Sequence, residues 1–146
     1  MSYSNTNTSS SPVEWTVTLK LDPPLASDLF SRQAELAARK CRSSKTENKS
    51  TQIRRFYDEL VLWHEQVKTA PDPEAKFREI EPYLQMLRAK AAYARARKLI
   101  DENFRVLVNA LLDGIKGPAS LENGKLFFEA FLGFRKFLEM TEGSRK

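Results

Sequence analysis

Apolar residues recur at helical spacing through most of the chain. In the clearest segment, Ile53, Phe56, Leu60 and Val67 follow one another at intervals of three, four and seven residues. Side chains at that spacing share one face of an α-helix, because each residue turns the helix by about 100°. The same criterion predicts five helices, over about residues 25–41, 50–68, 73–99, 101–113 and 119–141.

Local signals mark where these helices should begin, bend and end. The Ser50-Thr51 pair is suited to the N-cap of the second helix, and Asp72 is suited to that of the third. Pro82 should kink or restart the third helix, because its ring clashes with the carbonyl oxygen four residues earlier. Gly114 should lie just past the end of the fourth helix.

Two of the predicted helices differ in the kind of apolar face they carry. The first should bury Leu25, Leu29 and Leu36 together with its alanines. The last carries aromatic residues on more than one face, namely Phe127, Phe128, Phe131, Phe134 and Phe137. A helix of the second kind lies deep in a bundle or contacts another protein.

The chain before residue 25 has a different pattern. Residues 1–12 are rich in Ser, Asn and Thr and should be disordered, because they have little apolar surface to bury. Residues 13–21 alternate apolar and polar positions, which is typical of extended chain that must lie on the domain or on a neighbour. We therefore predict an all-α protein. A flexible or extended arm (1–24) should precede a single bundle of about five helices (25–142) and a disordered tail (143–146).

Residues able to carry out catalysis are few. His64 is the only histidine and should be half exposed on its helix, whereas Cys41, the only cysteine, lies in a polar stretch. No His/Cys pair has the spacing of metal ligands, and no glycine-rich loop for phosphates is present. We therefore expect a protein that is not an enzyme and that has no metal site and no cofactor.

Two observations bear on where the chain works. A single cysteine allows no internal disulfide, which fits a reducing cytoplasm. The first residues lack the apolar core of a signal peptide, and no segment approaches the roughly 18 apolar residues of a membrane span. The sequence therefore predicts a cytoplasmic protein that has no membrane partner.

Positive charge is concentrated in two segments. The chain has 24 Lys and Arg residues against 19 Asp and Glu residues, a net charge of +5. Residues 39–57 hold seven basic residues and one acidic residue, and residues 86–100 hold five basic residues and no acidic one. Such clusters suit the phosphate backbone of a nucleic acid. A solvated surface, a membrane surface and an acidic protein remain the alternatives.

The second basic segment should present two strips if it is one helix. Arg88, Arg95 and Lys98 would share one face, and Lys90 and Arg97 another. Tyr93 lies among them and could stack on a base, although a tyrosine at helical spacing more often packs at the rim of a core.

The order of the motifs resembles a known family. The motif S-T-Q-I-R-R-F-Y covers residues 50–57, and L-x-x-K-x-x-Y-x-x-x-R runs from Leu87 to Arg97. A helix with Phe104 and Ile115 follows, and an aromatic helix with L-F-F-E-A-F ends the pattern. Over about residues 48–140 this resembles the small helical subunit of the type III-A CRISPR effector, the Csm complex. The chain departs from the family pattern at Ala96, where glycine is frequent, and in its longer N-terminal arm.

The resemblance implies a non-catalytic RNA-binding subunit that is present in several copies. Such subunits contact the backbone of target RNA paired with guide RNA, without reading its sequence. They also touch one another and the large subunit that carries the nuclease and cyclase activities. The residues shared by the basic clusters and the motifs, or next to them, are the candidate RNA-binding residues: Lys49, Gln52, Arg54, Arg55, Arg88, Lys90, Tyr93 and Arg97.

One alternative function remains open at the level of sequence. The aromatic C-terminal helix could serve a protein–protein adaptor that has no role in nucleic-acid binding. The salt dependence of RNA binding would separate the two functions, because only phosphate contacts release counterions.

Overall fold

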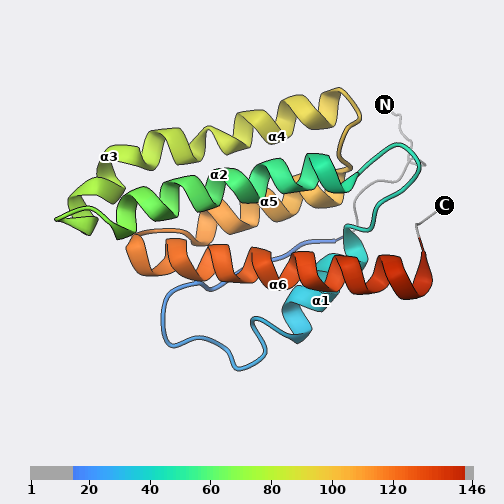
Figure 1. Ribbon diagram of the computed structural model, residues 1–146, viewed down its shortest axis with the longest axis horizontal. Coiled ribbons are helices and arrows are strands. Elements are labelled where there is room, and N and C mark those ends of the chain that lie inside the picture. Colours follow the sequence, from blue (N-terminus) through green and yellow to red (C-terminus); the bar gives the residue numbers. More distant parts are fainter. Residues whose placement is uncertain (1–14, 144–146) are drawn as a thin grey trace, which may run out of the picture.

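The computed structural model describes residues 15–143, and this part of the chain contains helices and no strand (Figure 1). The all-α prediction is therefore confirmed. The helices are α1 (Arg32–Lys40), α2 (Ser50–Lys68), α3 (Pro73–Gln85), α4 (Leu87–Ala96), α5 (Glu102–Gly114) and α6 (Pro118–Glu142). The disorder predicted for residues 1–12 concerns residues outside the described range, as does all but the first residue of the predicted tail.

The longer helices run back and forth along one axis (Figure 1). α2 runs the length of the bundle, α3 and α4 return in line beside it, and α5 and α6 repeat the course. Phe104 of α5 lies at the centre, with its ring 5.3 Å from that of Phe56 and 6.2 Å from those of Phe128 and Phe131. Most of the aromatic side chains of α6 therefore lie in the core, which is the first of the two alternatives predicted for this helix, a position deep in the bundle.

The helix predicted over 73–99 is divided in two. The chain continues through Pro82 as α3, and the break falls at Met86, between α3 and α4. Pro82 is exposed, so the hydrogen bond that it removes lies on the solvent side, where a helix tolerates the loss. The predicted segment is thus interrupted, but Pro82 does not restart the helix as predicted, because the break falls four residues later.

The first predicted helix is shorter than expected. α1 begins at Arg32, and residues before it form turns that bury Leu29. The buried face of α1 consists of alanines at positions 34, 37 and 38, which place its backbone close to α6. Leu36 lies on the other side and is 49% exposed, so the prediction that Leu36 is buried was wrong.

The segment before α1 contributes to the core. Trp15, Leu19 and Leu21 are buried, although this part of the chain is neither helix nor strand. The side-chain amide of Asn123 donates to the carbonyl oxygen of Leu21 at 2.9 Å, which fixes the segment to α6. From Trp15 onward the predicted arm is therefore extended chain packed on the domain.

Gly114 is required where this segment crosses the end of α5. A Cβ atom at position 114 would lie 2.6 Å from the carbonyl oxygen of Leu19, closer than real Cβ atoms come to any neighbour. Gly114 is also the last residue of α5 and does not lie beyond it as predicted. Gly114 therefore ends α5 and also allows the backbone at Leu19 to approach the end of this helix closely.

We predict opposite effects for two glycine-to-alanine changes. Gly114→Ala should destabilise the protein, because the new methyl group meets a backbone oxygen that cannot move freely. Gly133→Ala in the middle of α6 meets nothing within 4 Å. It should stabilise the protein by about 1 kcal/mol, the usual gain in helix propensity. Urea unfolding of both variants tests this, and a stable Gly114→Ala variant would contradict the packing described.

One buried cluster holds the linker between α1 and α2. Asn48 is fully buried with a positive φ of 59°, and its side chain accepts a hydrogen bond from the backbone N–H of Asp101 at 2.9 Å. Arg135 of α6 is about nine-tenths buried and donates to the carbonyl oxygens of Asn48, at 2.9 Å, and Cys41. These contacts join the linker to α6 and to the turn between α4 and α5.

Removing the Arg135 guanidinium should destabilise the fold. Arg135→Met keeps a long apolar stem but leaves two carbonyl oxygens without this donor, at a cost of roughly 1–3 kcal/mol for each buried group left unpaired. The exposed neighbour Lys136 provides the control, because Lys136→Gln should change stability by no more than about 0.5 kcal/mol. Equal unfolding midpoints for the two variants would show that the cluster does not stabilise the fold.

Candidate nucleic-acid interface

A groove of about 700 Å³ lies between α2 and α4. Four of the predicted RNA-binding residues line it, Gln52 and Arg55 from α2 and Lys90 and Tyr93 from α4. Its floor and walls are largely apolar, formed by Phe56, Leu62, Met86, Leu87, Ala89, Ala94 and Leu99. The two helices run side by side and antiparallel, so the start of α2 lies near the end of α4 (Figure 1).

The polar side chains of the groove differ in how far they are already paired. Arg55 is exposed and forms no ion pair with any residue in the described range 15–143. Lys90 contacts the carboxylate of Glu59 at 3.0 Å on the surface, a contact worth little in water. Arg97 donates to the hydroxyl of Tyr93 at 2.9 Å and lies 5.6 Å from its ring centroid. Arg55 and the Tyr93–Arg97 pair are therefore available to a ligand.

The backbone brings further cations to this end of the groove. The N–H of Asn48 donates to the carbonyl oxygen of Leu99 at 3.0 Å, which ties the start of α2 to the chain that follows α4. Lys49 and Lys98, the neighbours of these two residues, are exposed. Lys98 was not among the predicted site residues.

The predicted strip of Arg88, Arg95 and Lys98 does not exist. α4 ends at Ala96, and Lys98 has a positive φ of 62°, so it is not on the helix. Arg95 contacts Glu102 of α5 at 3.5 Å. The strip prediction failed because the helix ends three residues before the predicted boundary.

Arg88 is engaged in packing α4 against α5. Its guanidinium donates to Asn109 at 3.1 Å and to Asp113 at 2.7 Å, and its Nε donates to Gln85 at 2.7 Å. All of these partners belong to the described chain. Arg88 is thus separated from the groove and held by other side chains, although its sequence neighbours line the groove.

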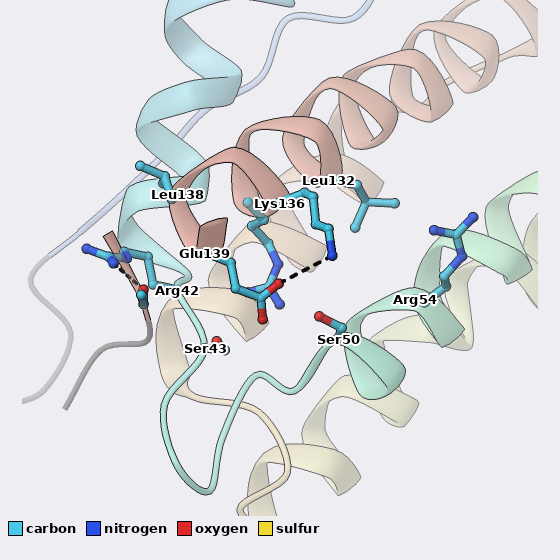
Figure 2. A pocket seen from close by; sticks show the side chains of 10 residues that line it. Arg42, Ser43, Ser50, Arg54, Leu132, Lys136, Leu138 and Glu139 are labelled. Atoms are coloured by element: carbon cyan, nitrogen blue, oxygen red, sulfur yellow. Dashed lines mark hydrogen bonds and ion pairs between the residues drawn. The ribbon is translucent and has the colours of Figure 1, made fainter. Parts of the chain in front are cut away.

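Arg54 lies on the other side of α2 from Arg55. It lines a pocket shared with α6, and Figure 2 shows it there with Ser50 and Lys136. Its guanidinium is 5.4 Å from the ring centroid of Tyr57. The predicted residues therefore do not form one continuous track. The groove collects Gln52, Arg55, Lys90 and Tyr93, and Arg97 joins them through Tyr93.

Comparison with known proteins gives one match. The family model described as Csm2 Type III-A matches residues 25–141, which is most of the chain. No curated protein and no solved structure matches.

The two residues considered for catalysis are both buried. Cys41 is inaccessible at the end of α1, and His64 of α2 is only 9% exposed, so the predicted half-exposed histidine was wrong. Among residues 15–143 no group of three or more His, Cys, Asp or Glu side chains is arranged to hold a metal ion. None of the helices within the same range is long and apolar enough to cross a membrane.

His64 belongs to a polar layer between α2 and α6. Burial lowers its pKa most, and the nearby cation of Lys125 lowers it further. In the same layer Tyr57 donates to Glu129 at 2.7 Å, and burial together with this hydrogen bond raises the pKa of Tyr57 to about 12. Glu122 favours the charged form of His64 but does not reverse the shift.

The lowered pKa of His64 predicts a loss of stability in acid. The unfolded chain binds a proton near the ordinary pKa of 6.5, whereas the folded protein binds it only at lower pH. The free energy of unfolding should therefore fall as the pH drops below about 6.5. His64→Gln should remove part of this dependence. Urea unfolding between pH 7.5 and pH 5 tests this prediction, and an unchanged slope against pH in the variant would contradict it.

Proposed function

Because this chain belongs to the Csm2 type III-A family and is thus a small subunit of the type III-A CRISPR complex, we propose that it binds RNA through the phosphate backbone. The RNA is the target strand paired with guide RNA, and binding does not depend on its sequence. Several copies of the subunit act together, next to other subunits that include the large nuclease and cyclase subunit. The subunit itself is non-catalytic and works in the cytoplasm.

The observation that carries this proposal is the set of available cations at one end of the α2–α4 groove. Arg55 lines the groove, and Lys49, Arg97 and Lys98 are exposed at the adjoining ends of α2 and α4. None of the four pairs with a carboxylate within the described residues. Such cations are suited to bind phosphates, because they give up only water and counterions and do not first have to separate from a protein carboxylate. By contrast, Arg88 and Arg95 on the far side of α4 are already paired.

The groove also supports binding that is independent of sequence. Tyr93 is 61% exposed, and at an unpaired position of the strand any of the bases can stack on a tyrosine. Its ring is oriented by the guanidinium of Arg97, so a base and a phosphate could be contacted by one pair of side chains. Lys90 can add a further phosphate contact after releasing Glu59, because that surface pair is weak.

The adaptor alternative loses most of its basis. It required the aromatic residues of α6 to face a partner, but Phe127, Phe128 and Phe131 are buried in the bundle. Only Phe137 and Met140 near the end of α6 are large apolar side chains left exposed on this helix.

Substitution of the groove cations tests the proposed function. The isolated wild-type protein should bind single-stranded RNA of any sequence with a Kd of about 10⁻⁴–10⁻⁶ M at physiological salt. Arg55→Ala and Arg97→Ala should each weaken binding to every sequence and lower the log–log salt slope by about one unit. Fluorescence anisotropy of labelled oligonucleotides at several KCl concentrations measures both quantities.

Arg78 of α3 is the matched control for these variants. It is exposed and belongs to the helix that begins at the opposite end of the bundle (Figure 1). Arg78→Ala removes the same charge and should leave the salt slope unchanged. The proposal fails if the Arg55 and Arg97 variants fold normally and bind RNA with the same slope as this control.

A further inference from the structure

A second cavity, of about 390 Å³, lies between the start of α2 and the last turns of α6. Figure 2 shows Ser50 and Arg54 of α2 on one side and Leu132, Lys136 and Glu139 of α6 on the other. Arg42 and Ser43 of the linker close its end, and Arg135 forms part of its wall. Three separate segments of the chain therefore contribute to it.

The lining of this pocket is strongly basic. Arg42, Arg54, Arg135 and Lys136 contribute four positive charges, against the single carboxylate of Glu139. Arg135 is held by backbone carbonyl oxygens, and Arg42 contacts Glu142 at 3.2 Å. Arg54, whose guanidinium contacts the ring of Tyr57, and Lys136 are the cations left for a ligand. Lys136 lies 4.0 Å from Glu139 and is 72% exposed, so this pair contributes little.

The α2 end of the pocket adds hydrogen-bond donors. α2 has no capping side chain and no acidic residue in its first turn, whereas Asp72 and Asp101 cap α3 and α5. The Ser50 hydroxyl has no hydrogen-bond partner among residues 15–143, and it points toward Lys136 and Glu139 in Figure 2. The partial positive charge of the helix end is therefore not neutralised by the protein.

We propose that this pocket binds a phosphate group, which Arg54, Lys136 and Ser50 hold between them. Cations from two helices and a free hydroxyl at an uncapped helix end are the donors that a phosphate requires. Glu139 swings away from Lys136 when the anion enters, because their weak contact leaves it free to move.

The proposed source of the phosphate is the same RNA strand that occupies the groove, so this part rests on the proposed function. Gln52 and Arg55 face the groove, and Ser50 and Arg54 face the pocket. The two sites are thus separated by the first turns of one helix, whose diameter is about 10 Å. A strand that crosses the start of α2 would place phosphates on both sides.

The matched pairs Lys136–Glu139 and Lys76–Glu79 make the test specific. Both are surface pairs spaced by three residues, but Lys76 and Glu79 lie on α3, away from the pocket. Lys136→Gln should weaken binding of inorganic phosphate, and Glu139→Gln should strengthen it. The same changes at Lys76 and Glu79 should do neither. Titration with inorganic phosphate, followed by the amide resonance of Ser50, measures this directly.

RNA titrations supply the second arm of the test. Lys136→Gln should lower the salt slope for single-stranded RNA by about one unit relative to Lys76→Gln. If phosphate alone binds but this slope is unchanged, RNA is overturned as the source and a free phosphate takes its place. If neither phosphate nor RNA distinguishes the two lysine variants, the pocket proposal is overturned. If the salt slope falls in Lys136→Gln but not in Arg55→Ala or Arg97→Ala, the pocket proposal is supported and the proposed groove interface is overturned.

Discussion

The end of the bundle that carries the candidate interfaces depends on one buried cation. Burial lowers the pKa of Arg135, and a guanidinium in such a position must keep its hydrogen bonds, since an unpaired charge away from water is very costly. Two of these bonds go to the carbonyl oxygens of Cys41 and Asn48. The linker between α1 and α2 can therefore adopt few conformations in which Arg135 stays satisfied. Because Asn48 in turn binds Leu99 and Asp101, the position of α2 relative to the end of α4 follows from the same requirement.

This constraint explains how the polar linker between α1 and α2 can support a defined surface. Lys49 directly follows the buried Asn48. Lys98 directly precedes Leu99, whose carbonyl oxygen accepts a hydrogen bond from the backbone N–H of Asn48. The two lysines are exposed, but the backbones of their neighbours Asn48 and Leu99 are joined by this hydrogen bond. Their charges are thus held near one another without any contact between the side chains. A surface arranged in this way can keep its cations in water until a phosphate replaces the counterions, which is the source of affinity in backbone binding.

Helix boundaries that depend on the periodicity of apolar residues were predicted from the sequence. Features that depend on contacts between distant segments were missed. The apolar repeats of α2, α5 and α6 gave nearly correct boundaries, because each of these helices has its own buried face. The alternating pattern predicted that residues 13–21 lie on the domain or on a neighbour, but it did not identify which of these surfaces covers Trp15 and Leu21. The same limit applies to Arg88, whose partners Asn109 and Asp113 lie more than twenty residues away. The family motifs identified several residues of the groove, but they did not separate cations that pack helices from cations left in water.

Arg54 and Arg55 show that cations adjacent in the sequence need not belong to the same binding surface. Successive residues on a helix are rotated by about 100°, so two adjacent arginines can be directed to different surfaces. In this chain one faces α4 and the other faces α6. If only one of these surfaces bound an anion, the other arginine would add charge repulsion near the same helix end. The first turn of α2 has no acidic residue to offset this repulsion. A single anionic strand that passes over the first turn of α2 would neutralise both arginines at once, and this arrangement accounts for both basic surfaces with one ligand.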